Sequence, residues 1–246
     1  MYKIRRQDKE QNPFESLKTV IKAQNFIRLG FFCEKKALIR PFKVIDFFEN
    51  RITIDSNIHQ NKISIHNHIF EGIKTDEKIC SYSAKYLSVY GTGQIKRNTI
   101  IWDFISGKAS NFADCRPLQN LKTFEIKESN FDLNLADTLQ LGICHNDEVY
   151  IVAVQQGKIN DKYYFHSAKQ GRKQDLLQLN NNIIIEAEIL QKENLLYQNK
   201  NAKVSKVYDE DEKSAAMAAI VYKTANINYN FNKNQLQNID IFKIEI

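Results

Sequence analysis

The chain has few of the residues that interrupt helices and strands, with only 3 prolines and 8 glycines among 246 residues. Because flexible linkers are usually rich in such residues, their scarcity argues against a long disordered connector. The length suits one large domain or two of about 120 residues each. With 43% apolar and 26% charged residues, the composition is that of an ordinary globular protein.

Cysteine is scarce as well, and its spacing argues against two kinds of site. The four cysteines are Cys33, Cys80, Cys115 and Cys144, and none forms a C-x-x-C pair. Neither a zinc site nor a redox dithiol is therefore indicated. No charged-then-apolar leader opens the sequence, and no apolar run approaches the roughly 20 residues that span a bilayer. We expect a cytoplasmic location with free thiols, and no membrane partner.

The chain also lacks a concentrated block of charge. Its 35 basic and 29 acidic residues give a net charge of +6 and a pI near 9.0. This excess suits an anionic ligand, and it equally suits a lysine-rich surface. Nucleic-acid binders gather such charge on one face or in a tail, whereas the nearest basic arm here, "MYKIRRQDK", is short and holds an aspartate. We expect no nucleic-acid partner.

Two segments of the chain share one pattern of strands and turns. Residues 26–56 and 138–167 both carry an early Leu-Gly pair, then an apolar run, a polar turn, an alternating segment and a serine. The ends of the two halves look alike too, because residues 121–129 and 239–246 both read as strands of Phe-x-Ile type. The sequence therefore predicts an internal duplication.

Strand signals dominate each half, since segments rich in Val, Ile, Tyr and Phe alternate with Asn, Asp and Gly turns. In the second half the predicted strands are 139–144, 149–156, 162–166, 183–190, 195–207 and 238–246, and the predicted helices are 168–179 and 211–224. The second helix has acids in its first turn and Lys223 in its last, as the helix dipole favours. We predict a mainly β fold with a few helices, built as one small antiparallel barrel in residues 1–131 and another in residues 132–246.

The first predicted helix of the second half carries an unusual pair of charges. Ser167 fits an N-cap, and Gln170 completes the capping-box spacing S-x-x-Q. Arg172 and Lys173 would then lie in the second turn, near an end of the helix that is already partly positive. A solvated surface pair is one interpretation. The alternative is a bound phosphate, which would gain backbone donors, a serine hydroxyl, a guanidinium and an ammonium.

The segment "YYFHSAKQGRKQDLL" resembles the signature of the pyridoxamine 5'-phosphate oxidase-like FMN-binding split-barrel flavoproteins, in the branch of the nitroimidazole-resistance proteins. The match runs from Tyr164 to Leu177. The opening "IRRQDKE" and the later "DEDEK" also resemble elements of that branch. The resemblance covers the second half well and the first half loosely.

The resemblance implies a six-stranded split barrel that dimerises and holds FMN in the interface between two barrels. It assigns the flavin phosphate to Ser167, Arg172 and Lys173. The full set of cofactor-binding residues that it implies is Ala153, Val154, Gln155, His166, Ser167, Ala168, Arg172 and Lys173. The chain departs from the family in two places: Ala153 stands where proline is usual, and "YQNK" from Tyr197 replaces a Tyr-x-Ser-Val run.

The first half has features complementary to those of the second. Aligned with the phosphate motif, "DSNIHQNKIS" (55–64) has Asp55 in place of the histidine and Asn61 in place of the arginine. An aspartate would repel a phosphate, so we expect that this repeat has lost its flavin site. It keeps Pro41 and the run "YLSV" (86–89). These features predict a single-chain pseudo-dimer with one FMN, either monomeric or as a homodimer.

The resemblance implies a flavin-dependent oxidoreductase that passes electrons from NAD(P)H to a small acceptor, with His166 as a candidate proton donor. The alternative is a non-catalytic flavin-binding or haem-binding barrel. The histidines of "HQNKISIHNH" (59–68) leave a metal or haem site open in principle, but they fit the polar face of a strand better. We predict no metal. Trp102 is expected in the core of the first half.

Overall fold

The computed structural model describes residues 10–24, 26–33, 36–55, 65–71, 86–96, 99–110, 125–146, 148–192 and 194–246. The chain divides into two compact units, residues 1–126 and 127–246, whereas the sequence predicted a boundary after residue 131. Three features predicted from the sequence lie wholly or mostly outside the described residues: the basic arm, residues 56–64 with His59, and the start of the strand at 121–129.

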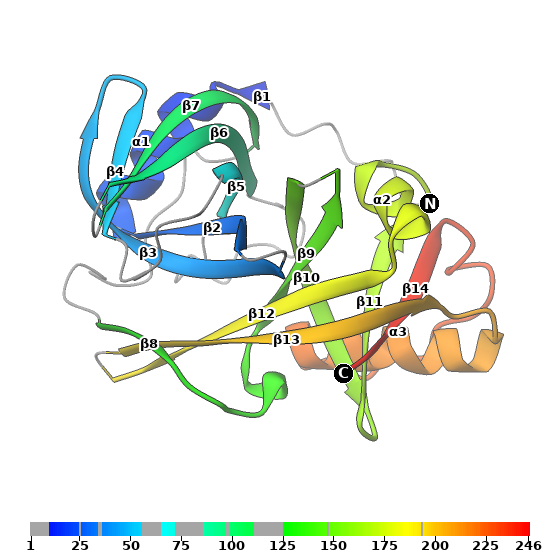
Figure 1. Cartoon of the computed structure of the whole chain (residues 1–246). Coiled ribbons are helices and arrows are strands. Elements are labelled where there is room, and N and C mark those ends of the chain that lie inside the picture. Colours follow the sequence, from blue (N-terminus) through cyan, green and yellow to red (C-terminus); the bar gives the residue numbers. More distant parts are fainter. Residues whose placement is uncertain are drawn as a thin grey trace. The chain divides into compact units, whose positions relative to one another are not determined.

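The second unit is an antiparallel barrel (Figure 1). Its strands are β9 (Thr138–His145), β10 (Glu148–Ile159), β11 (Lys162–Ala168), β12 (Asn182–Gln191), β13 (Asn194–Lys206) and β14 (Ile239–Glu245), and its helices are η2 (Leu133–Leu135), α2 (Arg172–Leu179) and α3 (Glu210–Ala225). A further strand, β8 (Glu125–Glu128), begins two residues before the unit boundary. Neighbouring strands follow the order β12-β9-β10-β11-β14-β13, and β13 pairs again with β12, so six strands form a closed ring. β8 adds to the edge of β13. The six strands predicted for this half are confirmed.

Tight hairpins set the register of this barrel. The β9–β10 hairpin closes at His145 opposite Glu148, and the β10–β11 hairpin closes at Ile159 opposite Lys162. Each leaves a two-residue loop that begins with an asparagine at positive φ, Asn146 at 49° and Asn160 at 53°. Asparagine adopts this left-handed conformation readily, and the resulting turns match the twist of paired strands.

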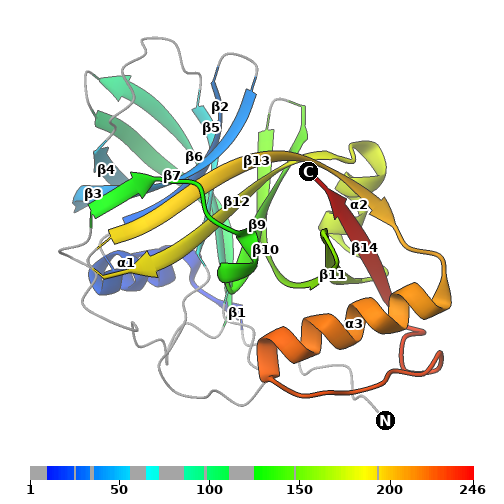
Figure 2. The ribbon, with the colours of Figure 1, turned by 90° about the horizontal axis from the view of Figure 1, so that it is seen from below.

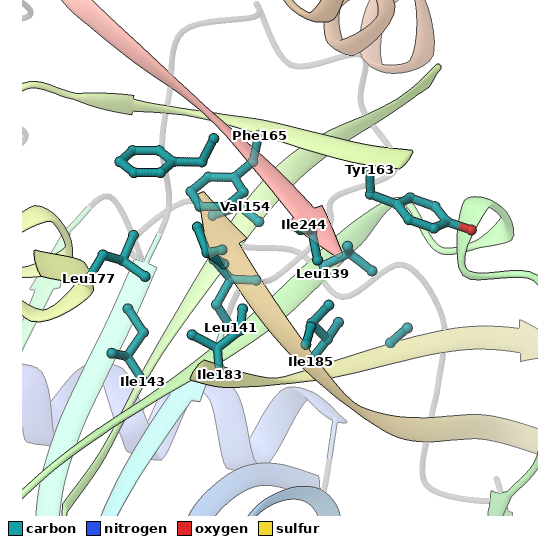
Figure 3. Packing of buried hydrophobic residues seen from close by; sticks show 14 of the residues in the cluster. Leu139, Leu141, Ile143, Val154, Tyr163, Phe165, Leu177, Ile183, Ile185 and Ile244 are labelled. Carbon is teal, nitrogen blue, oxygen red and sulfur yellow. The ribbon is translucent and has the colours of Figure 1, made fainter. Parts of the chain in front are cut away.

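Alternating apolar residues fill the barrel (Figure 3). Leu139, Leu141 and Ile143 of β9 point to the same side and are fully buried. The same core includes Ile183 and Ile185 of β12, Phe165 of β11, Val154 of β10, Ile244 of β14 and Leu177 of α2. Phe165 stacks on Phe242 with ring centroids 5.2 Å apart. This packing joins the middles of β11 and β14, where the two residues are directly opposite each other.

The helix α3 lies across the outside of the barrel (Figure 2). It begins after Asp209, whose side chain accepts a hydrogen bond from the Glu212 backbone N–H at 2.7 Å, and it ends at Asn226 in the left-handed conformation. The predicted helix at 211–224 is therefore confirmed, with slightly wider bounds. α3 packs closely on β10, because a Cβ added at Gly157 would lie 2.5 Å from the Ile220 nitrogen.

The connector before β9 is fixed to the barrel by side chains. The Gln156 amide, fully buried, donates to the carbonyl oxygens of Leu133 and Ala136 at 3.1 Å each. The Tyr163 hydroxyl donates to Asp132 at 3.0 Å. The Asn134 backbone N–H and this hydroxyl hold the pKa of Asp132 below its ordinary value. This connector is thus an ordered part of the second unit.

The first unit has the same strand connections. It contains β1 (Glu10–Gln11), α1 (Pro13–Gln24), β2 (Phe26–Cys33), β3 (Lys36–Phe48), β4 (Arg51–Asp55), β5 (Ile65–Glu71), β6 (Tyr86–Lys96) and β7 (Thr99–Ser110). Six strands again form a ring, in the order β5-β2-β3-β4-β7-β6 with β6 paired to β5, so that β2 to β7 occupy the places of β9 to β14. This shared order is what a duplication would produce. The mainly β fold with a barrel in each half is confirmed, whereas α1 was not predicted.

Strand registers match individual residues of the two units. Arg28 is opposite Pro41 in the β2–β3 hairpin, and Gln140 is opposite Ala153 at the same distance from the turn of the β9–β10 hairpin. Pro41 and Ala153 are therefore equivalent, as the sequence predicted. The match continues into β6 and β13 through rows of directly opposite residues. In the first unit the row Leu29–Ile69–Val89 crosses β2, β5 and β6, and in the second the row Leu141–Ile185–Lys200 crosses β9, β12 and β13. They align the run "YLSV" of β6 with "YQNK" of β13.

The predicted match between the ends of the two halves is wrong. β14, which includes most of residues 239–246, lies between β11 and β13. The equivalent place in the first unit, between β4 and β6, is taken by β7, whereas β8 at 125–128 lies beside β13. The Phe-x-Ile pattern occurs in both segments because each is a strand, and it does not distinguish one strand of a barrel from another.

Candidate functional site

The helix that carries the basic pair begins later than the sequence predicted. β11 continues through Ser167 to Ala168, and α2 begins at Arg172 after Gly171, which has φ 120° and no side-chain cap. The capping box of Ser167 and Gln170 is therefore wrong. Ser167 cannot cap the helix because it is a buried strand residue paired with Asp240.

This shift changes the place of the basic residues in the helix. Arg172 and Lys173 occupy the first turn of α2 instead of the second, so they lie nearer to the positive end of the helix dipole than expected. A helix over 168–179 would place Ala168, Leu176 and Leu179 on one apolar face, and the structure differs from that prediction as well. Leu176 and Leu177 are buried, whereas Leu179 is 65% exposed and Ala168 lies in the preceding strand.

The two cations rest on aromatic rings of neighbouring strands. The Arg172 guanidinium lies 4.8 Å from the centroid of the Tyr150 ring, and the Lys173 Nζ lies 5.4 Å from that of Phe165. The Lys173 Nζ also donates to the His166 carbonyl oxygen at 3.4 Å. The cation–π contacts hold both side chains at the junction of β10, β11 and α2.

Lys173 is desolvated in this position. Burial lowers its pKa from 10.5 to about 8, because the charged ammonium loses hydration that the ring and one carbonyl only partly replace. A dianion bound at the start of α2 would offset this cost. The N-terminal backbone N–H groups of α2 offer further donors, since they have no intrahelical partners and no side chain caps them.

A buried polar network lies beneath the same turn. Asp240 of β14 is opposite Ser167 in the β11–β14 ladder, and both residues are buried. One Asp240 oxygen, Oδ2, accepts hydrogen bonds from the Gln174 Nε2 and the Lys206 Nζ, each at 2.8 Å. The Gln174 Nε2 donates in addition to the Ala168 carbonyl oxygen at 2.9 Å. The start of α2 is therefore tied to three strands of the barrel.

The predicted ring-side segment of the flavin site lies on a neighbouring strand. β10 and β11 pair as far as Gln156 opposite Phe165. Residues 153–155 of β10 and residues 166–168 of β11 therefore lie next to each other in the two strands, just beyond the last β10–β11 pair. Within the first segment, Ala153 is half-buried, Gln155 is exposed and Val154 points into the core. A contact from Val154 to a ligand outside the barrel would thus come from its backbone.

Sequence reasoning missed Gln174, Asp240 and Lys206. A signal for Asp240 was present, because strand alternation places it on the same face as Phe242 and Ile244. An acid on an inward face needs a partner. Nothing in the local sequence identified the partner, since Gln174 is 66 residues away from Asp240 along the chain.

The first unit does not repeat the basic motif in the described strands. Asp55 ends β4 at the position equivalent to His166, as the registers of the β3–β4 and β10–β11 hairpins show. Trp102 is fully buried there, so its predicted core position is confirmed. His66 and His68 lie in β5. Among the residues whose side chains the structure describes, no cluster of His, Cys, Asp or Glu suits a metal ion, and no described helix is long and apolar enough to cross a membrane.

Several solved structures are similar to about half of the chain. A protein named as a 5-nitroimidazole antibiotic resistance protein from Bacteroides thetaiotaomicron is 24% identical over 46% of this chain and 74% of its own, with a TM-score of 0.43. An FAD-binding protein from Mesorhizobium loti is 13% identical over 46% of this chain and 83% of its own, with a TM-score of 0.38. A protein named as a pyridoxamine 5'-phosphate oxidase from Listeria innocua is 15% identical over 46% of this chain and 85% of its own, with a TM-score of 0.37.

No protein-family model and no curated protein matches the chain. Two of the three structures carry the names of the protein kinds that the sequence motif resembles, nitroimidazole-resistance proteins and pyridoxamine-phosphate oxidases.

Proposed function

We propose that this protein binds FMN through its phosphate and acts as a flavin-dependent oxidoreductase on a small acceptor. One observation carries the proposal. Arg172 and Lys173 occupy the first turn of a helix that no side chain caps, and Lys173 there is a desolvated cation. Arg172 is exposed, but full solvation of the pair, the alternative interpretation, does not explain why the half-buried Lys173 places its ammonium over the Phe165 ring.

The residues present fit a phosphate monoester. The guanidinium can donate two parallel hydrogen bonds, the ammonium adds a point charge, and the first backbone N–H groups of α2 add neutral donors. Gly171 leaves room for such a group, since a Cβ added there would meet nothing within 4 Å. Its φ of 120° also favours glycine over other residues.

Bound FMN would supply the redox chemistry, by accepting a hydride or electrons from NAD(P)H and passing them on. The residues of this chain would bind and orient it. The Lys173 Nζ bonds to the His166 carbonyl oxygen, so the phosphate-binding turn and the end of β11 are held together. Residues 153–155 of β10 lie beside that end and would contact the flavin ring. His166 remains our candidate for holding a proton near the ring.

We further propose one FMN per chain and a duplicated origin for the two units. Asp55 at the position of His166 supports the stoichiometry, because a carboxylate there would repel a dianion. The shared strand order supports the duplication. A flavin-to-chain ratio near two would contradict the loss of the site in the first unit.

The test is to load purified protein with FMN and to record its absorbance after gel filtration. The double variant Arg172→Ala/Lys173→Ala should elute without flavin, whereas the matched pair Lys169→Ala/Gln170→Ala, exposed in the same turn, should keep it. Tight FMN binding by the first variant, or a colourless wild type that ignores FMN, would refute the proposal. A haem absorption band would favour a haem-binding barrel instead.

Catalysis needs a separate measurement. The FMN-loaded protein should oxidise NADH or NADPH in the presence of a nitroaromatic acceptor, and the double variant should not. A flavin-loaded protein without such activity for any acceptor tried would be a flavin carrier.

A further inference from the structure

The turn that presents the basic pair lacks the usual means of fixing a helix start. Gly171 has no side chain, and no side-chain oxygen caps α2. Glycine is also the residue that loses the most conformational freedom on ordering. The backbone from Ala168 to Arg172 must therefore be held from elsewhere if its donors are to point in one direction.

Gln174 supplies that restraint. It is the third residue of α2 and is 4% exposed. Its amide donates to the Ala168 carbonyl oxygen, on the strand side of the turn, and to Asp240 on β14. The Gln174 side chain thus links the helix after the turn to the strand β11 before it, and also to the strand β14. In a capping box the residue at this position bonds to a backbone N–H of the cap; here it bonds to a carbonyl beyond the turn.

Asp240 joins the members of this network, because its carboxylate accepts hydrogen bonds from both Gln174 and Lys206. Its carboxylate is buried, and the Lys206 Nζ, on a side chain that is 38% exposed, forms an ion pair with it at 2.8 Å. A buried carboxylate without such a partner would be strongly destabilising. It would also repel a phosphate, because Asp240 is directly opposite Ser167, one of the predicted phosphate contacts. The Asp240 carboxylate accepts the Gln174 hydrogen bond, and Lys206 neutralises the negative charge that would repel the phosphate.

We infer that Gln174 and Asp240 are positioning residues for the phosphate, and that Lys206 neutralises the negative charge of Asp240, which would otherwise repel the phosphate. The inference rests on the proposed FMN site. It assigns these residues no contact with the flavin ring. Their effect should therefore depend on the phosphate of the ligand.

This dependence gives a test that a purely structural role would not pass. Dissociation constants of FMN and riboflavin are measured by quenching of flavin fluorescence in the flavin-free protein. Gln174→Met, which keeps the chain length but not the donors, should weaken FMN binding roughly tenfold and leave riboflavin binding unchanged. Gln178→Met, at an exposed position of the same helix, is the matched control and should change neither.

The carboxylate is tested by a conservative rescue. Asp240→Asn retains an acceptor oxygen for Gln174 and should bind FMN nearly as the wild type does, whereas Asp240→Ala should lose as much as Gln174→Met. The double variant Gln174→Met/Asp240→Ala should bind FMN as tightly as the single variant with the lower FMN affinity, because the effects of residues in one network do not add. If Asp240→Ala does not fold, the comparison of Gln174→Met with Gln178→Met decides.

Lys206→Met should weaken FMN more at low than at high ionic strength, unlike Lys203→Met on the same strand. Two results would overturn the inference: equal losses of FMN and riboflavin affinity in Gln174→Met, or no loss of either. Failure of the wild type to bind FMN is a different outcome, because it would remove the proposed function itself.

Discussion

Replacement of Lys173 by methionine should make the flavin-free protein more stable while it removes flavin binding. The side chain lies over Phe165, with its Nζ on the His166 carbonyl oxygen. A methionine there keeps a long flexible chain and places sulfur against the ring, a favourable contact. It removes the ammonium and the cost of burying it.

The magnitude follows from the lowered pKa of Lys173, from 10.5 in the unfolded chain to about 8 in the folded protein. Such a difference corresponds to roughly 3 kcal/mol against the protonated folded form. Water still reaches part of the side chain, so we expect a gain of about 2 kcal/mol at pH 7. The penalty is fully present below pH 8, shrinks as the pH rises from 8 to 10.5, and is absent above 10.5, where lysine is neutral in both states.

The assay is denaturant unfolding of the flavin-free wild type and Lys173→Met at pH 7 and pH 10, with Lys169→Met as the control for an exposed lysine of the same turn. The variant should be more stable than the wild type at pH 7, and the difference in stability should be much smaller at pH 10. Its FMN affinity should fall at least tenfold, as expected for a charge-assisted bond to phosphate. A loss of stability at pH 7, or unchanged FMN affinity, would refute the reasoning.

Other predictions concern the same site and the packing of α3. FMN affinity of the wild type should fall about tenfold per pH unit above the Lys173 pKa of about 8, since the bound dianion requires the protonated lysine, and isothermal titration should show proton uptake there. Tyr164→Phe removes a hydrogen bond of 2.8 Å to the α3 carboxylate of Glu212 and should cost about 1 kcal/mol in urea unfolding, whereas the exposed Tyr222→Phe should cost nothing. Gly157→Val should cost about 3 kcal/mol, because its side chain would overlap the α3 backbone.

The strands of the second unit were predictable because the barrel core depends on a local pattern. Leu139, Leu141 and Ile143 alternate with residues of the other face, and that alternation is visible without knowledge of the fold. The hairpin turns were equally visible, as asparagine marks the positive φ that they need. The helix α3 was predictable from its acids, alanines and final lysine.

The start of α2 was not predictable from the same local rules. Ser167 fits a helix cap in sequence, yet it continues β11 because its backbone pairs with β14, a strand much later in the chain. Tertiary pairing outweighs a capping preference of about 1 kcal/mol. The end of the first half was misassigned for a related reason, since two Phe-x-Ile strands differ only in their long-range partners.

The basic pair of the candidate site was evident in the sequence, but the residues that hold it were not. Arg172 and Lys173 draw attention as two cations at one helix end. Gln174 and Asp240 form their link across 66 residues of sequence. Residues that act through a distant buried partner leave only a weak signal, such as a polar side chain on an apolar face.

The most direct test of the account is the ³¹P NMR titration of FMN bound to the protein. If the phosphate lies between Arg172, Lys173 and the start of α2, its resonance should show one bound flavin per chain and remain that of the dianion well below pH 6, where free FMN protonates. A bound phosphate that titrates like that of free FMN would place it in solvent and contradict the account.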